Sequence, residues 1–237
     1  MILAACGDDD SDFATRPNGK ESSSGISPKS SDSETSVFAG TMTDSRDGQT
    51  YRTVKIGNQV WMAENLNYET ANSYCYKDSA SNCTKYGRLY TWAAAMDSAG
   101  TWSSNGKGCG YDVACSPTYP VRGVCPEGWH LPDTTEWNTL FTAVGGRLTA
   151  GTMLKSISGW YNSGDGTDTY SFSALPAGNC DDGGCYSEGN DAPFWSSTEG
   201  SSSSAYHMLL YDSDDGAYLL GCGKYNEFSV RCVKDTD

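Results

Sequence analysis

Residues 125–137 of this chain read Cys-Pro-Glu-Gly-Trp-His-Leu-Pro-Asp-Thr-Thr-Glu-Trp, and this stretch decides the fold. Asp133 stands at a helix N-cap position, where a carboxylate accepts backbone N–H groups, and Glu136 completes a capping box three residues later. Apolar residues then recur at helical spacing as far as Gly145-Gly146, where the pattern ends: Trp137, Leu140, Phe141 and Val144. The stretch therefore predicts a helix with one apolar face, and that face must pack on a sheet.

Short strands are expected on both sides of this helix. Upstream, Thr50–Ile56 alternates like a half-buried strand, Gly57-Asn58 supplies a two-residue turn, and Gln59–Met62 returns as the second strand of a hairpin. The Ala-rich residues 88–98 predict a second short helix. Downstream, turns rich in Gly, Asp and Ser separate five candidate strands, at residues 170–175, 194–198, 205–211, 217–220 and 228–233. Two short helices and antiparallel strands, without a parallel βαβ unit or an internal repeat, indicate an α+β domain.

Size and charge restrict the class of protein. The chain has 237 residues, so one domain of about 200 residues remains after a polar N-terminal stretch. The net charge is −14 and the pI about 4.4, whereas phosphate recognition needs clustered Lys and Arg, so we expect no nucleic-acid partner. No stretch of about 20 apolar residues occurs, so any membrane attachment must come from a lipid.

Ten cysteines are more than a reducing compartment usually keeps, and they lack the paired C-x-x-C spacing of zinc ribbons and redox motifs. Disulfides are the better interpretation. Three local pairs and one long-range pair are the candidates: Cys75 with Cys83, Cys109 with Cys115, Cys180 with Cys185, and Cys125 with Cys232. Cys222 is then left over, and the sequence leaves open whether it is free, buried or intermolecular.

The first residues, Leu3-Ala4-Ala5-Cys6-Gly7, resemble the lipobox of bacterial lipoproteins, in which a signal peptidase cleaves before the cysteine that carries the lipid. Cys6 would then be the site of lipid attachment, and residues 1–6 the remnant of a signal peptide. The basic and apolar segments of an export signal are missing before Cys6, so we expect a truncated or mis-started reading frame.

Residues 7–37 are acidic and Ser-rich and show no apolar periodicity. Such a segment cannot bury enough surface to offset its ordering entropy, so we expect a disordered linker before a globular domain at residues 38–237. Its opening acidic residues also resemble the surface-export signals of some Gram-negative lipoproteins: Asp8, Asp9, Asp10 and Asp12. That resemblance implies an outer-membrane lipoprotein that faces the outside of the cell.

Six motifs in order carry a family resemblance. They are residues 59–66 (QVWMAENL), 86–92 (YGRLYTW), 125–132 (CPEGWHLP), 173–178 (SALPAG), 194–199 (FWSSTE) and 229–233 (SVRCV). Together they closely resemble the Fibrobacter succinogenes major paralogous domain family, a set of surface-associated bacterial proteins, over residues 38–235. Residues 129–132, which lead into Glu136-Trp137, and the closing residues 230–233 are in turn similar to the C-type lectin-like fold and to formylglycine-generating enzymes.

The resemblance implies a C-type lectin-like fold, that is, an α+β domain with two short helices, antiparallel strands and long loops held by disulfides. In such domains an early cysteine bridges to one on the last strand, which supports the pairing of Cys125 with Cys232. Function in such a fold is expected in the loops.

The sequence offers little for catalysis. His130 lies in the Trp-His-Leu-Pro motif and His207 in a candidate strand, and both suit structural hydrogen bonds better than proton transfer. No G-x-S-x-G motif, H-E-x-x-H motif or phosphate-binding glycine loop occurs. Cys180 and Cys185 do have the C-x-x-x-x-C spacing of the copper-binding thiols in aerobic formylglycine-generating enzymes, and two thiolates would hold a cuprous ion. A loop disulfide is the preferred interpretation of that pair.

Clustered carboxylates also make calcium a cofactor to consider. Asp212, Asp214 and Asp215 precede a glycine in one turn, and Asp165 and Asp168 lie in another Gly-rich turn. Loop carboxylates suit calcium, but neither turn completes an EF-hand, and an acidic hairpin turn is the simpler interpretation.

Loop aromatics are candidates for stacking on sugar rings, because an aromatic face favours the apolar side of a pyranose. They are Trp102, Tyr111, Tyr119, Trp160 and Tyr161, each of which could equally be a core or loop anchor. The sequence thus predicts a lipid-anchored cell-surface module, not an enzyme, that binds an extracellular polysaccharide or a partner protein. Two alternatives remain, a formylglycine-generating-type copper oxidase using Cys180 and Cys185, and an envelope structural protein without a small ligand.

Overall fold

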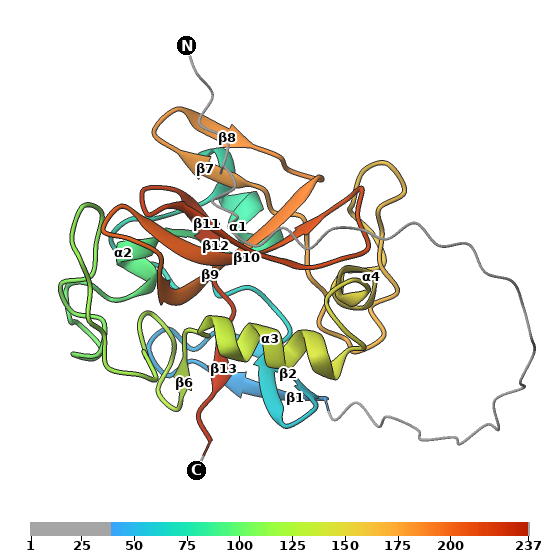
Figure 1. Cartoon of the computed structure of the whole chain (residues 1–237). Helices are drawn as coiled ribbons and strands as arrows, with labels where there is room; N and C mark the ends of the chain where they lie inside the picture. Colours follow the sequence, from blue (N-terminus) through green and yellow to red (C-terminus); the bar gives the residue numbers. More distant parts are fainter. Residues whose placement is uncertain (1–38, 237) are drawn as a thin grey trace, which may run out of the picture.

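The structure, a computed structural model, describes residues 39–236. Two sheets and four short α-helices make up this part of the chain (Figure 1). The chain is therefore mixed α+β and built mainly from sheets, as the sequence predicts. Cys6 and the predicted linker at residues 7–37 lie outside the described residues.

The smaller sheet contains both ends of the described chain (Figure 1). Its strand order is β1-β2-β3-β13-β6, with β1 (Ala39–Thr43), β2 (Thr50–Ile56), β3 (Gln59–Met62), β6 (Trp129–His130) and β13 (Val233–Lys234). β2 and β3 form the predicted hairpin, and Gly57 supplies the positive φ, 59°, that its tight turn requires. β13 pairs antiparallel with both β3 and β6, so the last strand joins the hairpin to the start of the longest helix.

The larger sheet has the order β11-β10-β9-β12-β5-β4, and the hairpin β7-β8 is attached to β12. Its strands are β4 (Ser73–Tyr74), β5 (Leu89–Thr91), β7 (Asn179–Asp181), β8 (Gly184–Tyr186), β9 (Asp191–Glu199), β10 (Ser204–Tyr211), β11 (Tyr218–Gly223) and β12 (Glu227–Ser229). β9, β10 and β11 form an antiparallel meander with β11 at the edge. β12 runs parallel to β9, which the expectation of antiparallel strands did not include.

Short helices connect these strands. They are the 3-10 helix η1 (Tyr76–Asp78) and the α-helices α1 (Ala80–Tyr86), α2 (Trp92–Ala95), α3 (Thr134–Ala143) and α4 (Ala150–Leu154). The expected number of two is too low, because α1 and α4 are too short to produce a clear apolar period. Within residues 39–236, none of these helices has the length and apolar character needed to span a bilayer.

The predicted capping box starts α3. The Asp133 carboxylate accepts the Glu136 N–H at 2.8 Å, and the Glu136 carboxylate accepts the Asp133 N–H at 2.9 Å. The apolar face of α3 then packs between the two sheets (Figure 1). Its Trp137 ring lies 4.7 Å from that of Trp61 on β3 and 6.1 Å from that of Phe194 on β9. Full burial of each such side chain contributes roughly 1.5–3 kcal/mol, so this cluster fixes the helix on both sheets.

The helix predicted at residues 88–98 is only partly present. The chain first forms β5, which pairs with β12 through Tyr90 and Phe228, and then α2, which has 4 residues. The Thr91 hydroxyl caps α2 by accepting the Ala94 N–H at 3.3 Å. Pairing with β12 thus takes Leu89–Thr91 out of the expected helix, and the alanines that follow remain helical in α2.

The strand predicted at residues 170–175 is absent. Ser171 and Ser173 have φ angles of 56° and 54°, in the left-handed region that a strand excludes. A single bridge between Lys155 and Ala174 remains, and the buried Phe172 shows that the apolar pattern reflects core packing. The strand predicted at residues 228–233 is divided instead, because β12 belongs to the larger sheet and β13 to the smaller.

All four predicted disulfides are present. Their Cα–Cα distances are 4.9 Å for Cys75–Cys83, 5.0 Å for Cys109–Cys115, 4.0 Å for Cys180–Cys185 and 6.0 Å for Cys125–Cys232. The last bridge spans 107 residues and fastens the segment before β6 to the segment before β13. Cys222 is buried and is not a free thiol.

Candidate functional site

The three carboxylates considered for calcium have separate partners. Oδ2 of Asp212 accepts hydrogen bonds from the amides of Asn162 at 2.6 Å and Asn190 at 2.9 Å. Asp214 accepts the N–H of Gly216 at 2.6 Å, which is a local turn contact.

Asp215 in turn accepts the Thr152 hydroxyl at 2.7 Å, and this contact fastens the turn to α4. Among residues 39–236, no group of three or more His, Cys, Asp or Glu side chains is arranged to hold a metal ion.

Lys155 supplies the positive charge at this turn. Its side chain is buried, and its ammonium donates to the carbonyl oxygens of Tyr211 at 3.1 Å and Asp214 at 3.0 Å. Burial lowers the pKa of Lys155, while Asp215 and Asp212 act in the opposite direction. A cation of the protein itself therefore compensates the acidic turn.

The two histidines occupy structural positions. His130 is buried, with Nδ1 2.6 Å from Oδ1 of Asp235 and Nε2 2.7 Å from Oε1 of Glu136. Both nitrogens donate at once only in the charged imidazolium. Burial lowers the pKa of His130, but hydrogen bonds to Glu136 and then Asp235, together with their charges, outweigh burial, so that its pKa is raised.

His207 lies in the core of the larger sheet. Its ring centroid is 4.8 Å from that of Phe228 and 6.3 Å from that of Trp195. Burial lowers its pKa to about 4, so the ring is neutral at physiological pH.

The five loop aromatics differ sharply in exposure. Trp160 is 6% exposed, and its indole donates to the Ser156 hydroxyl at 3.1 Å and to the Ala174 carbonyl at 3.2 Å. It is a core residue and not an exposed loop aromatic. Trp102 is half-buried against Tyr68, with ring centroids 5.5 Å apart, and it anchors its loop.

Tyr111, Tyr119 and Tyr161 are exposed. Tyr161 packs over the backbone of Gly189, where a Cβ would meet its ring at 2.7 Å. Tyr119 donates to the Ser197 carbonyl at 3.3 Å. Of these three, Tyr111 has a second aromatic side chain against it.

Tyr111, Tyr225 and Tyr206 form what we term the tyrosine platform, at the edge of the larger sheet. The Tyr111 and Tyr225 ring centroids lie 5.6 Å apart at an interplanar angle of 80°, an edge-to-face contact. A Cβ on Gly223 would clash with the Tyr225 ring, so this ring covers the side-chain face of β11 at that position. In the β10–β11 ladder Tyr206 pairs with Gly221.

Strand alternation places Tyr206 on the face that Tyr225 covers. Residues paired directly across an antiparallel ladder share a face, as do alternate residues of one strand. Gly223 pairs with Ser204, two residues before Tyr206, and a Cβ on Gly221 would meet open space. The three tyrosines, 50%, 40% and 37% exposed for residues 111, 225 and 206, thus gather on one face of the sheet, where the Tyr225 ring covers Gly223 and Gly221 leaves the surface open.

A buried lysine holds the loop that carries Tyr111. The Lys224 ammonium donates to the carbonyls of Gly110 at 3.1 Å and Val113 at 3.0 Å, and to Oε1 of Glu199 at 2.5 Å. The Glu199 carboxylate also accepts the Cys115 N–H at 3.0 Å. With the Cys109–Cys115 bridge, these contacts fix the loop on the sheet.

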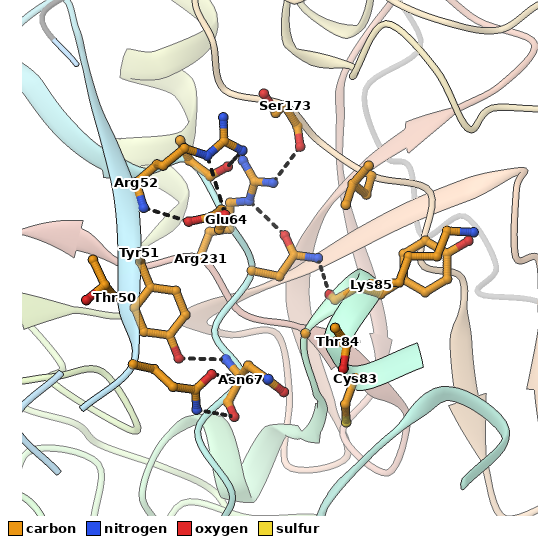
Figure 2. A pocket seen from close by; sticks show the side chains of 16 residues that line it. Thr50, Tyr51, Arg52, Glu64, Asn67, Cys83, Thr84, Lys85, Ser173 and Arg231 are labelled. Carbon is orange, nitrogen blue, oxygen red and sulfur yellow. Dashed lines mark hydrogen bonds and ion pairs between the residues drawn. The ribbon is translucent and has the colours of Figure 1, made fainter. Parts of the chain in front are cut away.

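A polar pocket of about 220 Å³ opens elsewhere, between β2, the loop after β3 and the end of α1 (Figure 2). We term it the Arg231 pocket. Its walls and floor include Arg52, Glu64, Asn65, Asn67, Lys85 and Arg231. Arg231 itself is fully buried, and its guanidinium stacks 4.3 Å from the Phe172 ring centroid.

Neutral oxygens accept the hydrogen bonds of Arg231. Nε donates to Oδ1 of Asn65 at 2.8 Å, and one terminal nitrogen donates to the carbonyl of Phe172. The other terminal nitrogen donates to the carbonyl of Ser173 (Figure 2). Asn65 continues the network by donating to the Tyr86 carbonyl at 2.8 Å. The network holds three irregular segments around one cation, and burial lowers the pKa of Arg231 to about 9.

Sequence reasoning missed Tyr206, Tyr225 and the Arg231 pocket. One indication was present in the sequence, because Gly221 and Gly223 alternate in a strand, where glycine marks the close approach of another group. The pocket has no comparable indication, since its residues come from distant segments.

Comparison with protein families matches residues 54–234 to the Fibrobacter succinogenes major domain. No curated protein and no solved structure matches the chain. The matched range covers most of the chain, from the hairpin to the last strand, and contains all six motifs, from Gln59 to Val233. The chain therefore belongs to the Fibrobacter succinogenes major domain family.

Proposed function

We propose that this chain is an extracytoplasmic, lipid-anchored cell-surface module that binds polysaccharide through the tyrosine platform. The observation that carries the proposal is the edge-to-face pair of Tyr111 and Tyr225 beside the glycines of β11. Three exposed tyrosines on one face of the sheet offer apolar ring surface together with hydroxyl groups. Sugar rings combine the same two characters, an apolar face and polar edges.

The rigidity of the platform supports binding. A binding surface that is fixed in advance loses less conformational entropy when its ligand arrives. Tyr225 is seated on Gly223, and Lys224, the residue between them, is fixed by the carbonyls and carboxylate described above. The Tyr111 loop is closed by the Cys109–Cys115 bridge.

The cellular setting is proposed on other grounds. Four disulfides favour an oxidising compartment outside the cytoplasm. The lipobox-like residues around Cys6 favour lipid attachment at the outer membrane. For the fold, an α+β domain whose first and last strands share one sheet and whose loops are held by disulfides favours the C-type lectin-like class.

The copper oxidase alternative has less support. It needs Cys180 and Cys185 as two thiolates, whereas the two residues form a disulfide across the β7–β8 hairpin. Titration of the denatured, unreduced protein with a thiol reagent tests this point. We expect no free thiol at these two residues. Detection of both as free thiols would instead support the copper oxidase alternative.

A polysaccharide screen tests the proposed function. The protein from Val37 onward is applied to immobilised neutral and acidic plant and microbial polysaccharides, once with calcium and once with a chelator. We expect retention on at least one neutral polysaccharide, unchanged by the chelator, because the carboxylates of the acidic turn have protein partners. Absence of retention on every polysaccharide would contradict the proposal and favour a protein partner or an envelope structural role. Loss of retention with the chelator would move the site from the platform to the carboxylates.

A further inference from the structure

The Arg231 pocket differs in charge from the rest of the molecule. Its lining contains three cationic side chains, Arg52, Lys85 and Arg231, and one carboxylate, Glu64. The whole chain carries a net charge of −14. Most of the surface of such an acidic protein repels a small anion, whereas the cationic pocket attracts it.

The single carboxylate of the pocket already has a partner. Nε of Arg52 lies 3.4 Å from Oε1 of Glu64, and the Arg52 N–H donates to Oε2 of Glu64 at 2.6 Å (Figure 2). The side chains of this pair are 57% and 41% exposed, so water screens the pair and Arg52 can turn toward a ligand. Glu64 thus offsets one cation and leaves two.

Arg231 places a buried cation below the pocket, and the charges of Asp168 and Glu64 act on it without a hydrogen bond to either carboxylate. Its acceptors among the described residues are amide and peptide oxygens, which carry no net charge. A buried cation without a hydrogen-bonded carboxylate is costly, and an anion in the adjoining cavity lowers that cost through its field. Lys85 adds a second cation at the wall; its side chain is 58% exposed, and its ammonium is 4.0 Å from the Glu188 carboxylate, which does not line the pocket.

The remaining lining is suited to hydroxyl groups. Oδ1 of Asn67 is buried without a hydrogen-bond donor, although the rest of that residue is fixed by the Tyr51 hydroxyl and the Gln49 amide (Figure 2). Thr50 and Thr84 also line the cavity. A volume of about 220 Å³ holds about seven waters at roughly 30 Å³ each, which is the size of one sugar unit.

We propose that the Arg231 pocket binds a single carboxylated sugar unit, such as a hexuronate. The carboxylate lies toward Arg52 and Lys85 above the buried Arg231, and the sugar hydroxyls face Thr50 and Thr84. The site is separate from the tyrosine platform and does not depend on the function proposed for it.

Titration of the full chain with sodium galacturonate and sodium glucuronate, followed by calorimetry and by amide NMR, tests this assignment. Galactose and sodium acetate are the comparison ligands. We expect at least one uronate to bind at least tenfold more tightly than either comparison ligand, and to shift the amide signals of Thr84 and Gly87 at the pocket wall. Equal binding of galactose would overturn the anionic assignment, and equal binding of acetate would overturn the sugar assignment.

Variants locate the site. Lys85→Gln and Arg52→Gln each remove one exposed charge from the wall, and we expect each to weaken uronate binding by roughly fivefold. Lys55→Gln is the matched control, since Lys55 is an exposed cation on β2 outside the pocket lining. An equal loss in Lys55→Gln would show a general charge effect and contradict the site. Because the ligand is a small soluble acid, failure here leaves the polysaccharide screen of the platform unaffected.

Discussion

Nε2 of His130 lies 2.7 Å from Oε1 of Glu136, while the other oxygen of the same carboxylate accepts the Asp133 N–H that begins α3. One carboxylate therefore connects strand β6, the helix cap and, through the other nitrogen of His130, Asp235 beyond the last strand. The imidazolium is the form that satisfies both carboxylates. Protonation of His130 is thus coupled to the packing of α3 on the smaller sheet.

This coupling predicts a pH-dependent stability. The folded pKa of His130 is raised above its ordinary 6.5, so its contribution is fully present below about pH 6.5 and is lost as the pH rises through the folded pKa. His130→Gln should therefore lower the free energy of unfolding by about 1–3 kcal/mol at pH 5.5 and by less at pH 8.5. Urea denaturation of both proteins at the two pH values measures the difference. The same loss of stability at both pH values would contradict a stabilising role of the charged imidazolium.

A substitution of Glu227 on β12 is expected to raise the stability of the protein, in contrast to the substitution of His130. Burial, followed by the charges of Asp78, Asp181 and Asp182, raises its pKa to about 7. The folded state then holds this proton more tightly than the unfolded state, so stability falls as the pH rises from about 4.5 to 7. Glu227→Gln should raise the free energy of unfolding at pH 8 by about 1–2 kcal/mol and leave it nearly unchanged at pH 4. Equal or lower stability of Glu227→Gln at pH 8 would show that the ionised carboxylate does not destabilise the folded state.

Removal of the buried Lys224 ammonium is expected to cause a large loss of stability. Lys224→Met leaves the Glu199 carboxylate without its ammonium partner and frees three carbonyl acceptors. We expect a loss of about 3 kcal/mol in the free energy of unfolding and faster proteolysis within residues 104–118. Lys107→Met, an exposed lysine of the same loop, is the control and should change stability by no more than about 0.5 kcal/mol. Similar effects of the two variants would contradict the role of Lys224.

The long-range disulfide is expected to stabilise the fold more than a short-range one. The Cys125–Cys232 bridge closes a loop with a sequence separation of 107, for which chain entropy gives about 4.7 kcal/mol, against about 2.5 kcal/mol for the separation of 8 at Cys75–Cys83. The double variants Cys125→Ser/Cys232→Ser and Cys75→Ser/Cys83→Ser should therefore differ in unfolding free energy in that order. A larger loss from the shorter bridge would show that local strain or packing, and not loop closure, sets the effect.

Local patterns in the sequence predict local structure well in this chain. The Asp133–Glu136 capping box and the hairpin about Gly57 are present as predicted, because each is decided by residues within a few positions of one another. The helix expected at residues 88–98 is shortened because β12, more than 100 residues later, pairs with its first half.

The buried cations could not be predicted from the sequence. The Lys224 ammonium reaches the Gly110 carbonyl across a sequence separation of 114, and Arg231 reaches Ser173 across 58. Their acceptors are mostly backbone oxygens, which every residue type carries, so the sequence does not indicate them. In the same way, Trp160 and Tyr111 look alike as loop aromatics, and only the folded chain shows that the first is buried and the second exposed.

The most direct test of the proposed function compares single-tyrosine variants on the polysaccharide that retains the wild-type protein. Tyr111→Ala and Tyr225→Ala remove the two rings of the edge-to-face pair, while Tyr74→Ala removes a tyrosine of similar exposure on β4, outside the platform. Affinity electrophoresis should show at least a tenfold weaker association for each platform variant and an unchanged association for Tyr74→Ala. Undiminished retention of both platform variants, with their folding confirmed by thermal denaturation, would contradict the account.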